Sequence, residues 1–464
     1  MSAPGGADPL WTSEEIAAAT GGVASTPFAT SGVAFDSREV GPGDLFIALK
    51  GEATDGHNFL DKAFAAGAAG AIVAHPIVQP HVLVADTEQA LNALGRAARA
   101  RMHGKVIGVT GSVGKTSTKE ALFAALERGL RGRTHRSVKS YNNHVGVPLS
   151  LARMPRDTAF GVFEMGMNHA GELAALTRLV RPHVAIITAI APAHIEFFGT
   201  EEAIAHAKAE IFEGLEAGGL AIIPYDSPHR ELLVRAAEAQ GACVLTFGLK
   251  QGADVRAAEA VPAASGGTLV AATMPGVELC YTVATPGDHN VANSLAIMAA
   301  VEAVGGDLAA AGLALAEMPG LAGRGARHQV QAEGGAALLI DESYNANPLS
   351  MAATIRQLGR EQAQRRMVVL GAMKELGDQT SALHAGLAEP IEQAAVDYAL
   401  LVGEEMAPLA ARLEGRLALA HVADTEAALA AVHDTMRAGD AILVKGSNSV
   451  GLSRLVAALV GGGR

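Results

Sequence analysis

The sequence predicts an α/β protein of three domains: a central sheet covered by helices on both faces, a similar sheet towards the C-terminus and a small α/β domain at the N-terminus. The 464 residues exceed what a single hydrophobic core usually covers. From Lys105 onward, apolar runs of strand length alternate with helix-like segments, as in parallel sheets covered by helices. One such run leads into a glycine-rich loop that opens a helix. We place the domains at residues 1–103, 104–323 and 324–464.

Composition excludes several classes of protein. The net charge is -12 and no stripe of Lys and Arg is present, which argues against a nucleic-acid surface. No signal peptide is evident, and no apolar run approaches the roughly 20 residues that span a bilayer. Two cysteines, Cys243 and Cys280, are too few for a disulfide framework and fit a reducing compartment. We therefore expect a soluble cytoplasmic protein, which we take to be a monomer.

The first hundred residues predict short strands and a helix. In GVAFDSREVGPGDLFIALKG, a Gly-Pro-Gly-Asp turn separates two apolar runs, which indicates strand, turn and strand. No cluster of catalytic residue types lies in this segment. The small N-terminal domain is therefore not expected to carry the chemistry.

The segment KVIGVTGSVGKTSTKEAL predicts a phosphate site in the central domain. A strand that enters a glycine turn and then a helix presents backbone N–H groups beside a positive helix end. Gly111 and Gly114 allow close approach of a ligand, Lys115 neutralises phosphate charge, and the Thr116 hydroxyl can reach Mg²⁺. The strict P-loop pattern has glycine where this chain has Val109, so the match is to a shorter variant. We expect a nucleoside triphosphate in a P-loop ATPase-like domain, with an ordinary strand-to-helix turn as the alternative.

Two further residues follow strands of the same predicted sheet. Glu164 ends the run AFGVFE, and His194 follows HVAIITAIAP. In doubly wound sheets, ligands bind beyond the carboxyl ends of the strands. Mg²⁺ prefers oxygen ligands, which favours Glu164 as a metal residue. Taken singly, each residue is also compatible with a solvated or capping role.

Lys208 is unusual because helical spacing places it among apolar residues. Ile204, Ile211 and Phe212 fall on the same face of the predicted helix. A lysine in this position can run its apolar stem along the surface and keep its charge in water. Alternatively, burial lowers the lysine pKa and frees a neutral amine, which can become a carbamate that offers oxygen to a metal.

The last third of the chain predicts a Rossmann-like domain. Gly305 and Gly306 end the helix predicted by NVANSLAIMAAVEAV, and the PGLAGRGARHQV that follows is typical of a hinge. After it, apolar strands again alternate with helices, and the strand runs are ALLIDESY, RMVVLGAM, VDYALLVG and DAILVKGS.

Together these segments resemble the Mur ligase family, the ATP-dependent amino-acid-adding enzymes of peptidoglycan synthesis. The resemblance covers nearly the whole chain and rests on these motifs: TGSVGKTSTKE, SYNNHVGVPLSL, EMGMNHAGEL, APAHIEFFGT, AKAEIF, PGDHNVANSLAIMAA, GRGAR, DESYNANP, LGAMKELGD and VKGSNSVG. Within this family, the residues of three segments most resemble the branch that adds D-alanyl-D-alanine to UDP-N-acetylmuramoyl-tripeptide. These segments are DESYNANPLSM, LGAMKELGD and FDSREVGPGDLFIALKGE. The Asp-Asn-Pro-Arg stretch of the diaminopimelate-adding branch is absent. The resemblance thus implies an amide-forming ligase that works through an acyl phosphate and serves cell wall biogenesis, cell shape and cell division.

The resemblance also implies roles for individual residues. Asn290 and Asn293 would approach adenine, Arg324 the transferred phosphate and Asp341 the ribose. The full set implied for ATP is Gly111, Ser112, Gly114, Lys115, Thr116, Ser117, Asn290, Asn293, Arg324 and Asp341. Two Mg²⁺ ions would be held by Thr116, Glu164, His194 and a carbamylated Lys208. The catalytic residues would be Lys115, His194, Lys208 and Arg324.

For the other substrates, the resemblance implies contacts in all three domains. Ser37 and Arg38 would hold the uridine diphosphate, and Asn142 and Asn143 would lie near the sugar-peptide. The third domain would bind the incoming dipeptide, and Lys445 would help to position that dipeptide or the phosphates. Tyr344 and Asn345 would be further substrate-binding residues.

Two other readings are weighed against this one. A folylpolyglutamate synthetase-like ligase shares the second and third domains, but it lacks a UDP-binding first domain such as residues 1–103. A nucleotide-switch protein uses the same loop, but the guanine-reading Asn-Lys-x-Asp string is absent and a switch does not need Glu164, His194 and Lys208 together. The sequence leaves open whether the third residue of the tripeptide is lysine or diaminopimelate.

Overall fold

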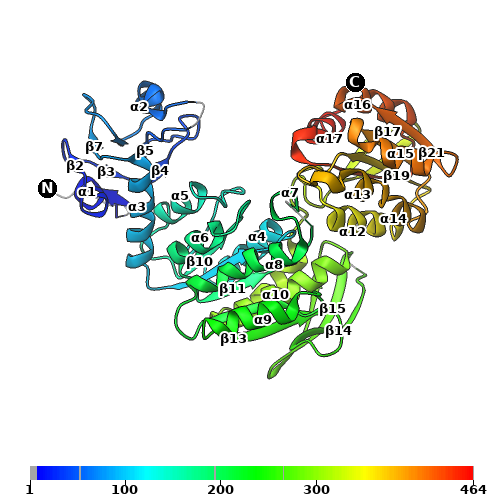
Figure 1. Cartoon of the computed structure of the whole chain (residues 1–464), viewed down its shortest axis with the longest axis horizontal. Helices are drawn as coiled ribbons and strands as arrows, with labels where there is room; N and C mark the ends of the chain where they lie inside the picture. Colours follow the sequence, from blue (N-terminus) through cyan, green and yellow to red (C-terminus); the bar gives the residue numbers. More distant parts are fainter. Residues whose placement is uncertain (1–7, 52–53, 193–194, 265, 463–464) are drawn as a thin grey trace.

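The computed structural model describes residues 8–51, 54–192, 195–264 and 266–462. Its chain forms three lobes in sequence order, blue, cyan to green, and yellow to red in Figure 1. Within the described residues, the strands form sheets of two, five, nine and six strands. None of the helices in these ranges is long and apolar enough to cross a membrane.

The first lobe contains a five-stranded sheet in the order β2-β7-β6-β5-β4. The two strands predicted around the Gly-Pro-Gly-Asp turn are β4 and β5, which pair in parallel. The loop between them, residues 35–43, carries Ser37 and Arg38. The elements of this lobe are β1 (Trp11–Thr12), α1 (Ser13–Thr20), β2 (Val23–Ala24), β3 (Ala29–Thr30), β4 (Gly32–Ala34), β5 (Asp44–Ile47), η1 (Gly56–Phe59), α2 (Leu60–Ala65), β6 (Gly70–Val73), β7 (His81–Leu83) and α3 (Thr87–Arg101).

Helix α3 connects the first lobe to the central one. It begins at Thr87, and the side chain of the preceding Asp86 caps it by accepting hydrogen bonds from the backbone N–H groups of Glu88 and Gln89. Along its length it packs against α1 of the first lobe and α5 of the central lobe. Ala90, Leu91 and other buried residues of α3 therefore join one core that extends across both lobes.

The central sheet has nine strands in the order β16-β15-β14-β13-β12-β11-β8-β10-β9. The strands from β8 to β13 run parallel, which confirms the predicted parallel sheet. β14 also pairs in parallel with β13, and β15 and β16 then extend the sheet as an antiparallel edge; the sequence revealed none of these three strands. The elements of this lobe are β8 (Lys105–Thr110), α4 (Lys115–Gly129), β9 (Thr134–Arg136), α5 (Gly146–Ala152), β10 (Phe160–Glu164), α6 (Glu172–Val180), β11 (Val184–Ile187), α7 (Ile195–Phe198), α8 (Glu201–Ala209), η2 (Glu210–Gly214), β12 (Leu220–Pro224), α9 (Arg230–Ala239), β13 (Cys243–Gly248), β14 (Val255–Pro262), β15 (Thr268–Met274), β16 (Val277–Val283), α10 (Asp288–Ala303) and α11 (Leu308–Glu317).

Both faces of the central sheet are buried. On β8, Val106 belongs to one core cluster, while Ile107 and Val109 belong to another, because successive side chains of a strand point to opposite faces. Helices α4 and α10 contribute Leu122 and Leu295 to the second cluster. This arrangement places the carboxyl ends of β8, β10 and β11 at one edge, where doubly wound sheets bind ligands.

The third lobe has a six-stranded sheet in the order β17-β18-β22-β19-β20-β21, parallel except for β17 at its edge. It follows a segment without helix or long strand, residues 318–325, where the sequence predicts a hinge. Its elements are β17 (Ala326–Ala332), β18 (Gly335–Glu342), α12 (Pro348–Gly359), β19 (Arg365–Gly371), η3 (Gly377–Gln379), α13 (Thr380–Ala385), α14 (Ala388–Gln393), β20 (Tyr398–Val402), η4 (Glu404–Met406), α15 (Ala407–Leu413), β21 (Ala418–Val422), α16 (Thr425–Thr435), β22 (Asp440–Lys445), η5 (Asn448–Val450) and α17 (Leu452–Val460).

Candidate active site

The glycine loop between β8 and α4 needs glycine at two positions. Gly111 and Gly114 have φ angles of +148° and +82°, a region that other residues adopt only with strain. There is also no room for a side chain. A Cβ atom at Gly111 would lie 2.0 Å from the Thr188 hydroxyl oxygen, and one at Gly114 would lie 2.8 Å from the Asn293 amide nitrogen. The loop is thus a tight cradle of backbone N–H groups at the N-terminus of α4.

Lys115 is the first residue of α4 and turns back over this loop. Its ammonium group donates to the carbonyl oxygen of Gly111 at 2.7 Å. Burial lowers the pKa of Lys115, the charge of Arg324 acts in the same direction, and the charge of Glu164 opposes them. A phosphate bound in the loop would give this ammonium a charge-assisted hydrogen bond.

Glu164 lies at the end of β10 and is 1% exposed. One carboxylate oxygen accepts from the Thr116 hydroxyl at 2.8 Å, and the other accepts from the Asn142 amide at 2.7 Å. Two of the residues predicted to hold a metal therefore meet beside the phosphate loop. No group of three or more His, Cys, Asp or Glu side chains suited to a metal occurs in the described ranges. A site with few protein ligands fits Mg²⁺, which keeps several waters and is commonly shared with substrate phosphates.

Lys208 lies near the end of α8 and is 2% exposed. Ile204, Ile211 and Phe212 are buried as well, so the lysine head is not carried out to solvent as in the surface alternative. No described residue forms a hydrogen bond or ion pair with it. Burial lowers the pKa of Lys208 well below its usual value, and the charge of Lys115 lowers it further. His194, the other residue predicted on this side of the site, lies outside the described residues.

A cleft of about 580 Å³ separates the central lobe from the third lobe and brings most of the predicted residues together. Residues of both lobes line it. The sequence-predicted residues along this cleft are Ser112, Gly114, Lys115, Ser117, Asn142, Glu164, Lys208, Asn290, Asn293, Arg324, Tyr344, Asn345 and Lys445.

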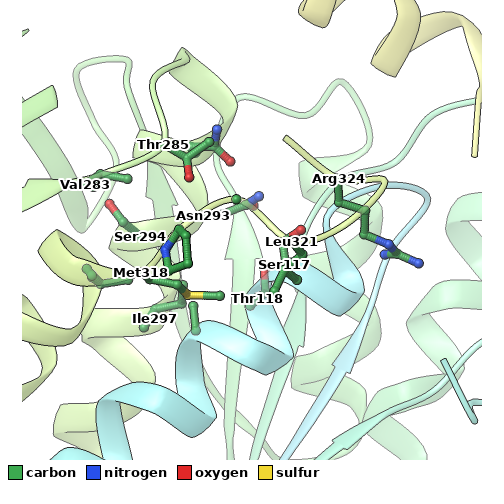
Figure 2. Close-up of a pocket in the computed structure, with 15 residues that line it drawn as sticks. Ser117, Thr118, Val283, Thr285, Asn293, Ser294, Ile297, Met318, Leu321 and Arg324 are labelled. Atoms are coloured by element: carbon green, nitrogen blue, oxygen red, sulfur yellow. The ribbon is translucent and has the colours of Figure 1, made fainter. Parts of the chain in front are cut away.

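A smaller hollow of about 60 Å³ adjoins this cleft where α4, α10 and the hinge meet (Figure 2). Its apolar walls include Met318, Leu321 and Ile297, while Asn290 and Asn293 supply amide groups. The Asn290 amide nitrogen donates to the carbonyl of Pro286 at 2.9 Å, which fixes the orientation of that side chain. Apolar walls with a few oriented amides suit a planar heteroaromatic ring.

Arg324 projects from the hinge between the two lobes. Its guanidinium donates to the Ser140 hydroxyl at 3.2 Å and lies 4.1 Å from the centre of the Tyr344 ring. Stacking on an aromatic face restricts an arginine without using all of its donors. The remaining N–H groups are therefore available to an anion in the cleft.

Asp341 and Glu342 are neighbours on β18 that face opposite ways. Asp341 is 5% exposed, and its carboxylate accepts from the backbone N–H of Gly323 at 2.6 Å and from Ser343 at 2.6 and 3.1 Å. It thus anchors the hinge and does not line the cleft. Glu342 does line it, and its carboxylate lies 3.3 Å from the Lys445 ammonium. Successive side chains of a strand point to opposite faces, so only one of these two acids can face the cleft. The motif Asp-Glu-Ser-Tyr does not reveal which one.

His289 is a second cleft residue that sequence reasoning missed. Desolvation at the cleft lowers the pKa of His289, the charge of Glu342 opposes this shift, and the charge of Lys445 adds to it. The preceding residue, Asp288, pairs across the two lobes with Arg360, which directly follows α12, at 2.8 and 3.1 Å. His289 is the second residue of α10, four residues before Asn293, so its place on the helix is visible in the sequence, whereas its position on the cleft lining is not.

The first-lobe residues lie apart from this cleft. Ser37 is 9% exposed, and the exposed Arg38 pairs with Asp36 at 2.6 Å. Asn143 accepts from the backbone N–H of Gly146 at 2.9 Å and so stabilises the start of α5. The structure therefore unites the predicted nucleotide and dipeptide residues and leaves the predicted uridine pair in the first lobe.

Three family models match this chain. The Mur ligase family catalytic domain matches residues 30–106, the Mur ligase middle domain residues 109–301, and the Mur ligase glutamate ligase domain residues 326–448. Together they span all three lobes, as the sequence motifs predict.

Individual relatives match over nearly their full lengths. A UDP-N-acetylmuramoyl-tripeptide-D-alanyl-D-alanine ligase of Bacillus subtilis is 35% identical, with 92% of this chain and 93% of the relative covered. A crystal structure of MurF from Acinetobacter baumannii has a TM-score of 0.84 at 32% identity, covering 98% of this chain and 99% of that chain. The MurF ligase of Thermotoga maritima in complex with ADP has a TM-score of 0.77 at 27% identity, covering 93% and 97%.

Proposed function

We propose, from the premise that this chain belongs to the Mur ligase family, that it is an ATP-dependent ligase joining D-alanyl-D-alanine to UDP-N-acetylmuramoyl-tripeptide. One observation carries the proposal: a single cleft gathers the phosphate-loop lysine, a buried carboxylate and the hinge arginine in a chain 35% identical to a ligase of that name. The Thermotoga maritima relative in complex with ADP supports ATP as the nucleotide.

The first step activates the tripeptide carboxylate, which is a poor electrophile in water. A carboxylate oxygen bonds to the γ-phosphorus of ATP, the bond from that phosphorus to the ADP oxygen breaks, and ADP leaves. The cationic side chains of Lys115 and Arg324 flank the transferring phosphoryl group, and their positive charge offsets the negative charge spread over its oxygens. Mg²⁺, for which Thr116 and Glu164 are suited, supplies further positive charge at the phosphates.

In the second step, the amine of D-alanyl-D-alanine attacks the acyl carbon, the amide bond forms, and phosphate and a proton leave. Tyr344, Asn345 and Lys445 lie on the third-lobe side of the cleft and would position the dipeptide. Closure of the two lobes would exclude the water that hydrolyses an acyl phosphate. This division of labour explains why the site needs residues from two lobes.

The remaining assignments complete the proposal. Residues 1–103 bind the UDP sugar through Ser37 and Arg38, residues 104–323 bind ATP, and residues 324–464 bind the dipeptide. Asn142 and Asn143 lie near the sugar-peptide. The reaction belongs in the cytoplasm, in keeping with two free cysteines, and we propose that the enzyme works as a monomer.

Lys208 is proposed to work as a carbamate. Its nitrogen would bond to the carbon of CO₂ and lose a proton, which converts a buried amine that has no side-chain partner among the described residues into an anion with two oxygens. Support comes from its burial, its place on the cleft lining and its low pKa, since only the neutral amine reacts. The carbamate would then complete a second Mg²⁺ site, together with His194.

We assign the ribose contact to Glu342 in place of Asp341, and two substitutions separate the roles. Asp341→Asn is expected to reduce the free energy of unfolding by about 1–3 kcal/mol, because one buried oxygen that accepts N–H groups becomes a donor. Glu342→Gln is expected to raise the KM for ATP about tenfold with little change in stability. Denaturant unfolding and steady-state kinetics measure both. A raised KM for Asp341→Asn with none for Glu342→Gln would return the role to Asp341.

The experiment that tests the function follows phosphate and oxygen. Release of phosphate from ATP should depend on both the UDP-tripeptide and D-alanyl-D-alanine. Oxygen-18 placed in the tripeptide carboxyl should appear in the released phosphate, because the acyl phosphate route transfers one carboxyl oxygen. A nucleotide switch would hydrolyse ATP without the dipeptide, and unlabelled phosphate would exclude the acyl phosphate.

A folylpolyglutamate synthetase-like activity is not favoured. The family model for the first Mur ligase domain matches residues 30–106, and the relatives at 32–35% identity cover 92–98% of this chain. The test is an assay with a folate and glutamate in place of the UDP-tripeptide and dipeptide, for which we expect no turnover.

A further inference from the structure

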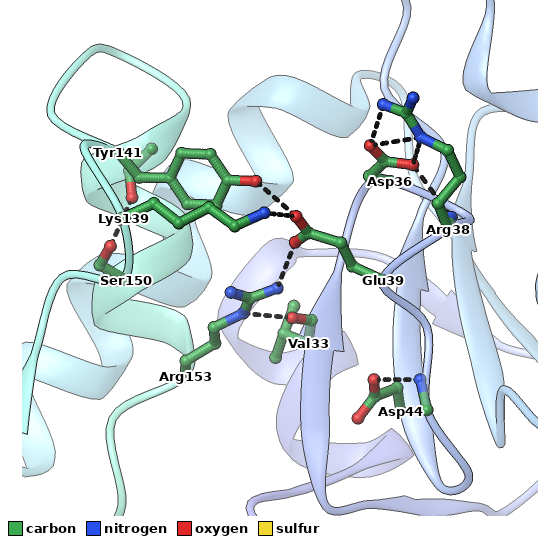
Figure 3. Close-up of polar contacts among 11 residues, drawn as sticks. Val33, Asp36, Arg38, Glu39, Asp44, Lys139, Tyr141, Ser150 and Arg153 are labelled. Atoms are coloured by element: carbon green, nitrogen blue, oxygen red, sulfur yellow. Dashed lines mark hydrogen bonds and ion pairs between the residues drawn. The ribbon is translucent and has the colours of Figure 1, made fainter. Parts of the chain in front are cut away.

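The carboxylate of Glu39 links the first lobe to the central lobe (Figure 3). Glu39 lies in the loop between β4 and β5, two residues after Ser37. It accepts from the Lys139 ammonium and from the Tyr141 hydroxyl at 2.9 Å, and the Arg153 guanidinium lies 3.7 Å away. Arg153 also donates to the carbonyl of Val33 at 2.5 Å. Three donors of the central lobe thus converge on one residue of the first.

Two of these donors belong to a segment that we name the bridging loop, residues 137–143. Its side chains alternate in direction: Lys139 and Tyr141 contact Glu39, while Ser140 and Asn142 face the cleft. Ser140 accepts from Arg324 at 3.2 Å, and Asn142 donates to Glu164 at 2.7 Å. Within four residues, the bridging loop therefore touches the first lobe, the hinge arginine and the metal carboxylate.

The bridging loop is also held from the central-lobe side. Lys119 of α4 is fully buried and donates to the carbonyls of Ser137 and Lys139 at 2.9 and 2.6 Å. The Ser137 hydroxyl in turn accepts from the backbone N–H of Glu164 at 3.1 Å. Lys139 has a φ of 53°, a strained value for a residue with a side chain, which persists only where the surroundings fix it. Glu39 and Lys119 provide that restraint from opposite sides.

We propose that Glu39 is a positioning residue for ligation: by holding Lys139 and Tyr141, it sets the bridging loop so that Ser140 and Asn142 orient Arg324 and Glu164. The inference rests on the proposed function. If this holds, Glu39 fixes the position of two parts of the protein at once. One is the loop of residues 35–43, which is proposed to bind the UDP sugar, and the other is the phosphoryl-transfer site of the central lobe. Small misplacement of charged groups at such a site slows the reaction more than it weakens binding.

Adhesion between lobes does not explain these contacts. The same junction is held by the Arg156–Glu15 pair at 2.6 Å and by the Trp11 indole N–H, which donates to the carbonyl of Ala152 at 2.8 Å. Neither contact touches the bridging loop. The Lys139 hydrogen bond also lowers the pKa of Glu39, so this carboxylate stays ionised through neutral pH.

The test compares Glu39→Gln with Glu15→Gln, a matched loss of one inter-lobe carboxylate away from the bridging loop. We expect Glu39→Gln to lower kcat about tenfold while the affinity for a non-hydrolysable ATP analogue with Mg²⁺ changes less than about twofold. Glu15→Gln should keep the kcat of the wild type. The temperature of thermal unfolding should fall by small amounts in both variants, since the ion pairs lost, two at Glu39 and one at Glu15, are partly exposed.

Tyr141→Phe provides a second variant that removes a single hydroxyl from the central lobe. It should lower kcat in the same direction, and the double variant with Glu39→Gln should be no slower than Glu39→Gln alone, since both changes cut one link. Provided that the wild type ligates, equal kcat values for Glu39→Gln and Glu15→Gln would overturn the inference. If Glu39→Gln does not fold, an unchanged kcat for Tyr141→Phe would overturn it instead. A wild type without ligation would instead overturn the proposed function, and this inference with it.

Discussion

Replacing Lys115 with alanine is expected to reduce ligation about a thousandfold or more. This lysine begins α4 at the phosphate loop, and its ammonium donates to the carbonyl of Gly111. Removing its charge leaves the phosphoryl oxygens with one fewer fixed cation as ADP departs. Because the transferring group carries charge on all its peripheral oxygens, the loss is felt mainly in the transition state and so lowers kcat.

The measurement is ADP and phosphate release with all three substrates present. Lys105→Ala serves as the control, because Lys105 is an exposed lysine at the opposite end of β8. Circular dichroism and thermal unfolding should show that both variants fold. Ligation by Lys115→Ala at the rate of Lys105→Ala would remove the phosphate role of this loop.

Replacing Lys208 with alanine is expected to lower activity at least about a hundredfold. The proposed carbamate would be lost, and with it a metal ligand in a region where no described side chain partners the amine. Lys208→Arg should be equally inactive, because a guanidinium stays charged and does not take up CO₂. The exposed Lys250 offers the control substitution, Lys250→Ala.

The carbamate itself has a separate readout. Carbon-13 bicarbonate should give a carbamate signal in the NMR spectrum of the wild type and of Lys250→Ala, and none in Lys208→Ala. Since burial and Lys115 lower the pKa of Lys208, its neutral form prevails above that lowered pKa, and activity should fall as pH drops through it. Full activity of Lys208→Ala, or the same signal in all three proteins, would show that the lysine acts without CO₂.

Much of the fold could be predicted from the sequence because buried strands are marked by local runs of apolar residues. The apolar runs at Lys105, Phe160 and Val184 are strands buried on both faces, so periodicity alone marks them. The strands β14 to β16 were missed; in β15 and β16, buried residues alternate with partly or fully exposed ones, so these strands are not covered on both faces. β14 in particular is largely exposed after Val255.

In the candidate site, too, some features can be predicted from the sequence and others are visible only in the structure. The phosphate loop is readable because its glycines and lysine are consecutive, and the backbone conformation it needs admits few other residues. The opposite orientations of Asp341 and Glu342 come from strand register, and the convergence on Glu39 joins residues about 100 positions apart along the chain. Such contacts depend on how the lobes pack, which neighbouring residues do not specify. The sequence by itself thus determines sites made of consecutive residues, such as the phosphate loop. Which charged side chains pair with one another is decided only by the tertiary structure, because the partners come from distant segments of the chain.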